Sequence, residues 1–527
     1  AEDGIRDQPR SRGLGDVYKR QDIGTSGVKT IVVNENGDLI SQAFEETRLY
    51  TPRPNWVEQD PQDWWLAVIK TVRKALANGG MSVDSIVGLG LSGQMHSSVF
   101  LDENNEVLRP SILWCDTRTT KQCGWITEMV GEDDLVRWVS NPALEGFTAP
   151  KLIWVRENEP QVYKSIKHVL LPKDYIRFRM TGELAMEVSD AAGTLLCDVR
   201  ERKWSDAMMD IIGVPNDFMP PIVESIDVCG YITKTVAEET GLKAGTPVVG
   251  GGADNTCGAV GAGIVRSGRI LSSVGTSGVV FAHTDDIHVD PEMRLHTFCH
   301  SVPDKWYLMG VTLFAGGAFQ WLRNTLGGVE VSAGKILDKD PYELFTEQAS
   351  RAPVGCQGLI FLPYLMGERT PHKDANARGA FVGLTGRHGR ADMIRSVMEG
   401  VTFAMKDSIE IMRALGLSIT EVRSTGGGAR SELWRQMQAD IFGGEVVTVN
   451  VEEGPAFGAA ILAGVGAGLY DTVEEATDQL VSVKSRIEPD KDSVLQYEDY
   501  YQIFKSMYPA LKPSFDALGA IKESYKA

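Results

Sequence analysis

The stretch IGTSGV at residues 23–28 decides the fold, because a near copy, VGTSGV, returns at residues 274–279. Their separation lies far beyond the periods of about 20–50 residues that mark solenoids and propellers. The β-branched run VKTIVV follows the first copy and VVFAHT follows the second, so each copy is predicted to be a turn between two adjacent strands. The repeat therefore predicts two similar domains.

The length and composition agree with two globular domains. A chain of 527 residues is long for one hydrophobic core, and 43% hydrophobic with 24% charged residues is ordinary. The formal net charge of −18 argues against nucleic acid or an anionic membrane as a main partner. Seven scattered cysteines without a CxxC pair favour neither disulfides nor structural zinc. Because we also find neither an apolar signal core nor an apolar run of ~20 residues, we expect a cytoplasmic protein.

Strands followed by glycine-rich loops and helices recur through both halves. In the segment NWVEQDPQDWW, Asp60 is the predicted N-cap of a helix and Pro61 occupies its first position. The segments at 244–263, AGTPVVGGGADNTCGAVGAG, and at 422–444, VRSTGGGARSELWRQMQADIFGG, each read as a strand, a triple-glycine loop and a helix. This order is typical of an α/β fold.

Two glycine motifs match nucleotide-binding signatures only in part. GLGLSG at 88–93 fits GxGxxG, but a strand-like run follows it where a dinucleotide site needs a helix. GTSGVKT at 24–30 lacks the GxxxxGK spacing of a P-loop. A tight glycine turn flanked by hydroxyls can still hold an anion. We interpret the two GTSG turns as a pair of clamps for a triphosphate, with two ordinary hairpins as the alternative.

Two further stretches carry candidate ligand-binding side chains. The loop SGQMHSSVF places Gln94, Met95 and His96 between two strands, where they are able to hydrogen-bond a polar ligand; a structural histidine is the alternative. Asp254 follows three glycines at the start of a small-residue helix, so it is either a helix N-cap or a catalytic group. Glycines before it let a substrate approach the backbone closely, which a pure cap does not require.

Taken in order, these segments resemble the FGGY family of carbohydrate kinases from Asp22 to about residue 510. The QMH loop, PKDY at 172–175 and YLMGERTPH at 364–372 favour the branch of this family that phosphorylates D-xylulose over the glycerol kinases. Other matching segments are LRPSILWCDTRT, GFTAPKLIWVREN, SDAAGTLLCDV and GAFVGLTGRHGRADMIRSVMEGV.

The resemblance implies an α/β fold with two actin-like (ribonuclease H-like) ATPase domains around a central cleft. The expected boundaries are a segment foreign to the fold at 1–21, a sugar-binding N-terminal domain at 22–262, an ATP-binding C-terminal domain at 263–510 and a tail at 511–527. Lys19, Arg20 and Gln21 stand where a central strand would be apolar. We therefore expect residues 1 to about 16 to be poorly ordered and the first strand to be frayed.

The resemblance also implies the activity, the phosphorylation of D-xylulose to D-xylulose 5-phosphate with ATP and Mg²⁺ as cofactors. It makes Asp254 the catalytic base and Asp22 the residue that supports the metal. The expected substrate-binding residues are Gln94, Met95, His96, Asp116, Asp254 and Asn255. The expected cofactor-binding residues are Thr25, Ser26, Lys29, Gly275, Thr276, Gly426, Gly427, Gly428 and Ala429.

Other functions stay open at this point. The chain is alternatively an FGGY kinase for another ketose or polyol, a non-catalytic actin-like ATPase or a sugar-binding regulator. An actin-like ATPase would not need the QMH loop, and a regulator would not need Asp254. The expected partners are D-xylulose and ATP, without nucleic acid or membrane, and a homodimer is allowed.

Overall fold

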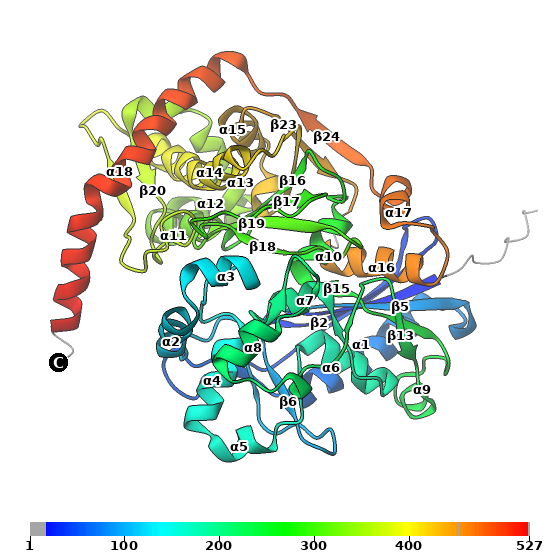
Figure 1. Cartoon of the computed structure of the whole chain (residues 1–527). Coiled ribbons are helices and arrows are strands. Elements are labelled where there is room, and N and C mark those ends of the chain that lie inside the picture. The colour runs from blue at the N-terminus through cyan, green and yellow to red at the C-terminus, as the bar shows by residue number, and fades with distance from the viewer. Residues whose placement is uncertain (1–16, 452–453, 525–527) are drawn as a thin grey trace, which may run out of the picture. The chain divides into compact units, whose positions relative to one another are not determined.

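The computed structural model describes residues 17–451 and 454–524, which form two compact units (Figure 1). Of the described residues, unit 1 holds 17–263, 299–303 and 454–480, and unit 2 holds 264–298, 304–451 and 481–524. The segment 454–480 thus packs with unit 1, although the expected sequence boundaries place it in the second domain. Within residues 17–451 and 454–524, no helix is long and apolar enough to cross a membrane.

Unit 1 is built on a mixed sheet in the order β13-β14-β5-β1-β2-β3, and β15 also pairs with β5. β3, β2 and β1 are antiparallel neighbours, whereas β1, β5 and β14 run parallel. The strands are β1 (Val17–Ile23), β2 (Gly27–Asn34), β3 (Leu39–Glu46), β5 (Ile86–Gly93), β13 (Val228–Tyr231), β14 (Pro247–Val249) and β15 (Gly252–Ala253).

The sheet of unit 2 repeats this plan in the order β18-β19-β17-β16-β22-β23-β24. Here β19, β17 and β16 are antiparallel, and β16, β22 and β23 are parallel. The same order and directions in both units confirm the predicted α/β fold with two ribonuclease H-like domains. The strands are β16 (Arg269–Val274), β17 (Gly278–Thr284), β18 (His296–Cys299), β19 (Trp306–Thr312), β22 (Glu421–Gly426), β23 (Glu445–Val449) and β24 (Val483–Ile487).

Helices cover both sheets, and short strand pairs complete the units. The helices of unit 1 are α1 (Pro61–Gly79), α2 (Thr120–Val130), α3 (Glu132–Trp138), α4 (Thr148–Asn158), α5 (Pro160–Ser165), α6 (Pro172–Thr181), α7 (Val188–Ala192), α8 (Asp206–Ile212), α9 (Lys234–Thr240), α10 (Asp254–Gly261), α16 (Gly454–Gly466) and α17 (Val473–Leu480). Those of unit 2 are α11 (Gly316–Leu326), α12 (Gly328–Leu337), α13 (Pro341–Ala349), α14 (Arg390–Ala414), α15 (Glu432–Phe442) and α18 (Lys491–Ser524). The short strands include β6 (Val99–Leu101), β7 (Ser111–Ile112), β8 (His168–Leu170), β20 (Ile360–Leu362) and β21 (Ala380–Val382).

Several local predictions are confirmed. Both GTSG segments form tight turns between adjacent strands, with Gly24 N donating to Gly27 O (3.0 Å) and Gly275 N donating to Ser277 O (3.0 Å). Asp60 caps α1 by accepting a hydrogen bond from Gln62 N. The first turn therefore joins β1 to β2, and the second joins β16 to β17.

The expectation of a frayed first strand is wrong for the backbone. β1 spans Val17–Ile23 and pairs along this whole length with both β2 and β5. Hydrogen bonds from two neighbouring strands satisfy the backbone N–H and C=O groups of a central strand, whether its side chains are polar or apolar. The expected disorder of residues 1–16 falls outside the described residues, as do the side chains of residues 17–22.

Glycines let α16 pack directly on the main chain of its neighbours in unit 1, β5 and α10 (Figure 1). A Cβ atom at Gly458 would overlap the carbonyl oxygen of Cys257 in α10, and one at Gly90 in β5 would overlap that of Ala459 in α16. The approach at Gly88 is looser, since a Cβ atom there would lie 3.1 Å from the carbonyl oxygen of Ala463. The GLGLSG motif is therefore a strand shaped for close helix packing.

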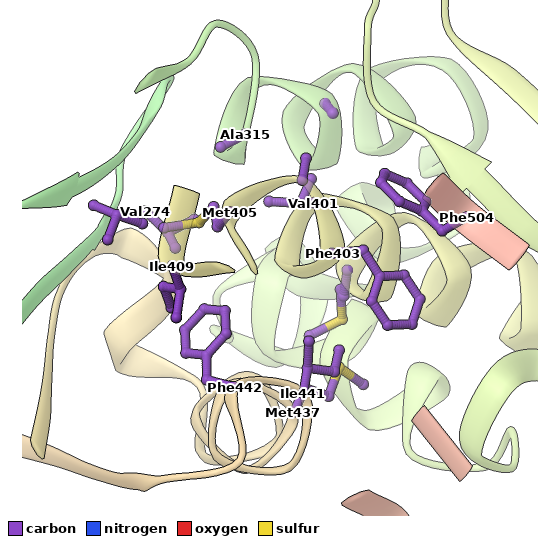
Figure 2. Packing of buried hydrophobic residues seen from close by; sticks show 14 of the residues in the cluster. Val274, Ala315, Val401, Phe403, Met405, Ile409, Met437, Ile441, Phe442 and Phe504 are labelled. Carbon is purple, nitrogen blue, oxygen red and sulfur yellow. The ribbon is translucent and has the colours of Figure 1, made fainter. Parts of the chain in front are cut away.

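The core of unit 2 gathers around α14, a helix of 25 residues (Figure 2). Its side chains Val401, Met405 and Ile409 lie among residues of β16, α15 and α18, of which Figure 2 labels Val274, Met437, Ile441, Phe442 and Phe504. The segment from residue 511, expected to be a tail, continues α18, and its Phe515 is part of this core.

We expect Gly458→Ala to lower the thermal stability, because the new methyl group has no space between α16 and α10. Overpacking costs roughly 1–3 kcal/mol, and each kcal/mol corresponds to about 2–4 °C in the Tm of a domain of this size. Gly124→Ala in α2 is the matched control, since a Cβ there meets nothing within 4 Å. Calorimetry that gives both variants the same Tm would contradict the packing argument.

One buried carboxyl makes the stability of unit 2 depend on pH. Glu368, from the YLMGERTPH segment, accepts hydrogen bonds at Oε1 from Leu313 N (2.9 Å) and Arg369 N (2.7 Å). Burial raises the pKa of this carboxyl to about 8 despite those two donors. In the unfolded chain a glutamate has a pKa of about 4.3. The folded state therefore holds a proton that the unfolded state releases between these values, and stability falls as the pH rises through this range.

Glu368→Gln is expected to remove this dependence, because an amide keeps the Oε1 acceptor and does not titrate. The Tm of the variant minus that of the wild type should be more positive at pH 8 than at pH 5. The exposed Glu347 on α13 provides the control, and Glu347→Gln should give the same difference at both pH values. Differential scanning fluorimetry measures the Tm of all three proteins. If the Tm difference between Glu368→Gln and the wild type is the same at pH 5 and pH 8, Glu368 does not cause the pH dependence.

Candidate functional site

The ends of two parallel strands bring the predicted substrate-binding residues of unit 1 together. β15 pairs in parallel with β5, with Ala253 opposite Gly93. The loop that begins at Gln94 and the helix that begins at Asp254 therefore leave the same edge of the sheet, where α/β proteins bind ligands. A side-chain contact joins them, since Asn255 Nδ2 lies 3.6 Å from Met95 Sδ.

His96 is held in one orientation in this loop. Its backbone is left-handed, with φ of 67°, and its ring lies 4.8 Å from that of Phe147, centroid to centroid. Nδ1 is 2.6 Å from the carbonyl oxygen of Gly193. Because a carbonyl only accepts, Nδ1 carries the proton, and Nε2 of the neutral ring is an acceptor. This tautomer suits a ligand hydroxyl as hydrogen-bond donor.

Asp254 is the first residue of α10 and does not cap it. Ala253 occupies the N-cap position, and no side-chain cap is present. The Asp254 carboxylate accepts a hydrogen bond at Oδ1 from the N–H of the next residue, Asn255 (2.7 Å). The side chain is half-buried. A carboxylate at a helix N-terminus is favoured by the helix dipole, and this one combines that position with partial exposure to solvent.

The triple-glycine loop before Asp254 lies against the main chain of β5. Gly251 has a φ of 74°, and a Cβ atom there would overlap the carbonyl oxygen of Leu91. At the end of the loop, Ala253 N donates to Ser189 Oγ (3.0 Å). Only glycine satisfies both the conformation and the close approach at Gly251. The packing of the loop therefore accounts for a glycine there, without the close approach of a substrate.

A buried ion network anchors the start of the same loop. Lys173 Nζ (3.3 Å) and Arg177 NH1 (3.0 Å) both donate to the carbonyl oxygen of Gly250. Lys173 also lies 2.9 Å from Asp174 and 3.2 Å from Asp190. Burial opposes the charge of Lys173, but the neighbouring carboxylates outweigh it and raise its pKa. The PKDY segment, singled out in the sequence, supplies this support for the Asp254 loop.

Gln94, expected to contact the sugar, is buried and uses its amide within unit 1. Its Nε2 donates to Gln59 Oε1 (3.0 Å), while its Oε1 accepts from Ser97 Oγ (3.2 Å) and Thr25 Oγ1 (3.3 Å). The amide therefore links the first GTSG turn to the loop that carries His96.

Asp116, a second expected substrate contact, is fully buried and fully engaged by protein groups. Its carboxylate accepts from Val57 N (2.6 Å) and from the main chain and guanidinium of Arg118, with Arg118 NH2 at 2.7 Å. Arg118 also lies 2.8 Å from Glu58 and stacks over the ring of Trp56. The residue belongs to a buried ion network with Arg118 and Glu58.

The first GTSG turn lies close to these residues and brings in Trp114, which sequence reasoning missed. Trp114 Nε1 donates to Thr25 Oγ1 (2.9 Å), and its ring is 46% exposed. Ser26 is exposed at the tip of the turn, and Lys29 follows in β2, opposite Asp22 of β1. An exposed tryptophan beside a glycine turn has no local sequence signal, because the chain between them spans 89 positions.

Unit 2 holds a cavity of about 780 Å³, within the usual range for small-molecule sites. Gly275 and Thr276 of the second GTSG turn line it, as do Gly427 and Gly428. The predicted Gly426 and Ala429 are neighbours of the lining residues. The start of α11 supports the turn, since Ala315 N donates to Thr276 O (2.9 Å) and Gly316 N donates to Gly275 O (2.8 Å).

Residues of α13 and of the start of α15 also line this cavity, and those of α13 are not among the predicted site residues. The lining there includes Asp340, Tyr342, Glu343, Glu347, Glu432 and Trp434. The cavity lining thus combines glycines, whose main chain is suited to phosphates, with acidic and aromatic side chains. No motif marks α13, because it reaches the cavity only through tertiary packing.

Comparison with known proteins places this geometry in a family. The model of the FGGY family of carbohydrate kinases, N-terminal domain, matches residues 17–261, and that of the C-terminal domain matches residues 270–467. A xylulose kinase from Bacillus subtilis is 41% identical over 95% of this chain and 99% of its own length. A gluconokinase from the same organism is 29% identical over 94% and 96% of the two chains.

A solved structure agrees in fold over nearly the whole chain. The ligand-bound xylulose kinase from Lactobacillus acidophilus has a TM-score of 0.89 and 26% identity, and the match covers 95% of this chain and 100% of that one. The two family models together span both units, and the Bacillus subtilis relative is similar along nearly its whole length. The chain therefore belongs to the FGGY family of carbohydrate kinases.

Proposed function

We propose that the protein transfers the terminal phosphate of ATP to D-xylulose and forms D-xylulose 5-phosphate. The observation that carries this proposal is the meeting of Met95, His96, Asp254 and Asn255 at one sheet edge. The names of the more similar relatives support the sugar, since the xylulose kinase from Bacillus subtilis is 41% identical and the gluconokinase 29%. Gluconate is the second candidate substrate on the same ground.

The cavity of unit 2 is proposed to hold ATP. The glycine turns at 275–276 and 427–428 would receive the phosphates, because their main chain approaches a ligand without side chains in between. The carboxylates of α13 would accept hydrogen bonds from ribose hydroxyls. The net charge of the protein is −18, and in this site main-chain N–H groups would hold the phosphates.

Asp254 would accept the proton of the attacking sugar hydroxyl. Phosphoryl transfer passes through a loose transition state, so the hydroxyl loses its proton late and a weakly basic carboxylate is sufficient. His96 would orient the sugar through Nε2, which accepts from a hydroxyl, and Met95 would give an apolar surface beside it. The reaction forms a bond between the hydroxyl oxygen and the γ-phosphorus and breaks the bond to the β-phosphate oxygen of ATP.

Mg²⁺ is proposed as the metal of the reaction. Across the described part of the chain, no group of three or more His, Cys, Asp or Glu side chains is placed to hold a metal ion. Mg²⁺ in kinases is commonly bound by one or two carboxylates together with substrate phosphates, so a single residue fits the role. Asp22 lies two residues before Gly24 of the first turn and would supply that carboxylate. The ion would neutralise charge on the phosphates.

The proposed substrate is tested by ADP release over a panel of sugars. We expect kcat/KM to be highest for D-xylulose among D-xylulose, D-ribulose, gluconate, xylitol and glycerol, because substrate choice reflects differential transition-state binding. A coupled assay measures all five under the same conditions, with sugar-free ATP hydrolysis as the baseline. A higher kcat/KM for gluconate would replace D-xylulose by the second candidate, and no activity above baseline would reject the kinase assignment.

Asp254→Asn is expected to lower kcat by about 10²–10⁴-fold, the usual contribution of a general base. The amide keeps the Oδ1 acceptor for Asn255 N, so the fold and ATP binding should persist. Asp133→Asn, the same change in the exposed first turn of α3, is the control. Calorimetric titration with ATP and steady-state kinetics test both variants; retention of more than about a tenth of the wild-type kcat would rule out Asp254 as the base.

A further inference from the structure

A buried lysine lies directly behind the loop that carries His96. Lys151, in the second turn of α4, is fully buried. Its Nζ donates to the carbonyl oxygen of His96 (3.0 Å) and to that of Gly146. Thr148 Oγ1 donates to the same His96 carbonyl (2.9 Å). Two side chains from the first turns of one helix thus hold one carbonyl of the site.

The His96 backbone needs such support. A φ of 67° is uncommon for a residue with a Cβ atom and carries strain, which persists only when neighbours fix the conformation. The carbonyl held by Lys151 and Thr148 belongs to this strained residue. Without these donors the peptide is free to relax, and the imidazole would turn away from the sheet edge that carries Asp254.

Gly193 fixes the ring of His96 from the other side. Its carbonyl oxygen accepts from Nδ1 (2.6 Å). The backbone of Gly193 is ordinary, with φ of −77°, so its conformation does not require glycine. A Cβ atom there would lie 2.9 Å from His96 Nδ1 and 3.0 Å from Met95 Cε. The absence of a side chain at Gly193 makes room for the two residues proposed to contact the sugar.

The surroundings of Lys151 show why a lysine there points to a role beyond stability. Burial lowers its pKa to about 7, opposed mainly by the negative charge of Asp116. Cys115 and Cys123 also face it, as does Arg118, whose positive charge acts in the same direction as burial. Burying an ammonium group costs stability unless it is well paired. An apolar side chain would fill this position with less cost but would leave the His96 carbonyl with the Thr148 hydroxyl and without the lysine as donor.

We propose that Lys151, Thr148 and Gly193 are positioning residues that clamp His96, setting both its main-chain conformation and its ring tautomer for sugar binding. Two of the three contacts act on the carbonyl and one on Nδ1, so together they fix the direction of Nε2. The inference rests on the proposed function only in naming a sugar as the ligand. None of the three residues is assigned a part in proton transfer.

The kinetic test compares Lys151→Met, Thr148→Val and Gly193→Ala. Each is expected to raise the KM for D-xylulose roughly tenfold to a hundredfold. Lys151→Met and Thr148→Val each remove a donor to the His96 carbonyl, and Gly193→Ala places a methyl group against His96 Nδ1. The KM for ATP should stay within about twofold of wild type, since ATP is proposed to bind in the unit 2 cavity, which His96 does not line. Gly124→Ala in α2 is the control for the glycine change and should alter neither KM.

Equal increases in the KM for D-xylulose and the KM for ATP would contradict the proposal that these residues position His96. An unchanged KM for D-xylulose in Thr148→Val and Gly193→Ala would contradict it as well. These two variants keep the proposal testable if Lys151→Met does not fold, because neither leaves a charge without its partners. A fall in kcat alone would also overturn it, since a positioning residue for binding acts on the sugar KM.

A spectroscopic test does not depend on the substrate. In the full-length protein with ¹⁵N-labelled histidine, the His96 signals, identified by their loss in His96→Gln, should report the Nδ1–H tautomer. Gly193→Ala should shift them toward a mixture of tautomers, whereas Gly124→Ala should not. If D-xylulose proves not to be the substrate, this measurement still decides on the clamp, and an Nε2–H tautomer in the wild type would refute it.

Discussion

Direct contact between main chains, with no Cβ atom in between, is the constraint on which the site in unit 1 depends. Gly458 brings α16 onto α10, Gly90 brings β5 onto α16, and Gly251 brings the loop before Asp254 onto β5. Close approach of this kind is available only to residues without a side chain. Since Asp254 begins α10, these contacts determine where its carboxylate lies. The glycines of unit 1 thus allow its main chains to pack in direct contact, and this packing positions Asp254 before any ligand binds.

Polar groups complete what the glycines begin. The charged side chains Lys173 and Arg177 hold the glycine loop by its carbonyl oxygen, and Lys151 holds His96 in the same manner. In each case a buried cation binds main-chain oxygen next to a proposed catalytic or binding residue. Buried charges of this type add little net stability but specify one arrangement of the loop. The two halves of the proposed sugar site are therefore fixed by equivalent means.

Local signals in the sequence were sufficient for the parts of the fold that local chemistry determines. The repeated GTSG letters gave the two turns and the two similar sheets, and Asp60 with Pro61 marked the start of α1. The residues Met95, His96, Asp254 and Asn255 were expected together and lie together, because each follows the end of a parallel strand. Periodicity, turn residues and caps are readable without tertiary contacts.

Features that arise from distant segments were not readable. The part of the unit 2 cavity lined by α13 has no motif. The buried environments of Gln94 and Asp116 depend in part on distant partners, Gln59 for Gln94 and Val57 for Asp116. The positive φ of His96 has no signature in its neighbours. The consecutive polar residues Lys19, Arg20 and Gln21 suggested a frayed strand, yet pairing with β2 and β5 determines the backbone there. In each case tertiary context overrides a local preference.

The assignment of α16 to unit 1 has a consequence for synthesis on the ribosome. Domains commonly fold in order as they emerge, the N-terminal one first. Here the face of the sheet that carries Gly88 and Gly90 is covered by a helix encoded after almost all of unit 2. A nascent chain that ends near residue 263 therefore has the sheet of unit 1 without its cover. This surface stays uncovered through the translation of residues 264–453.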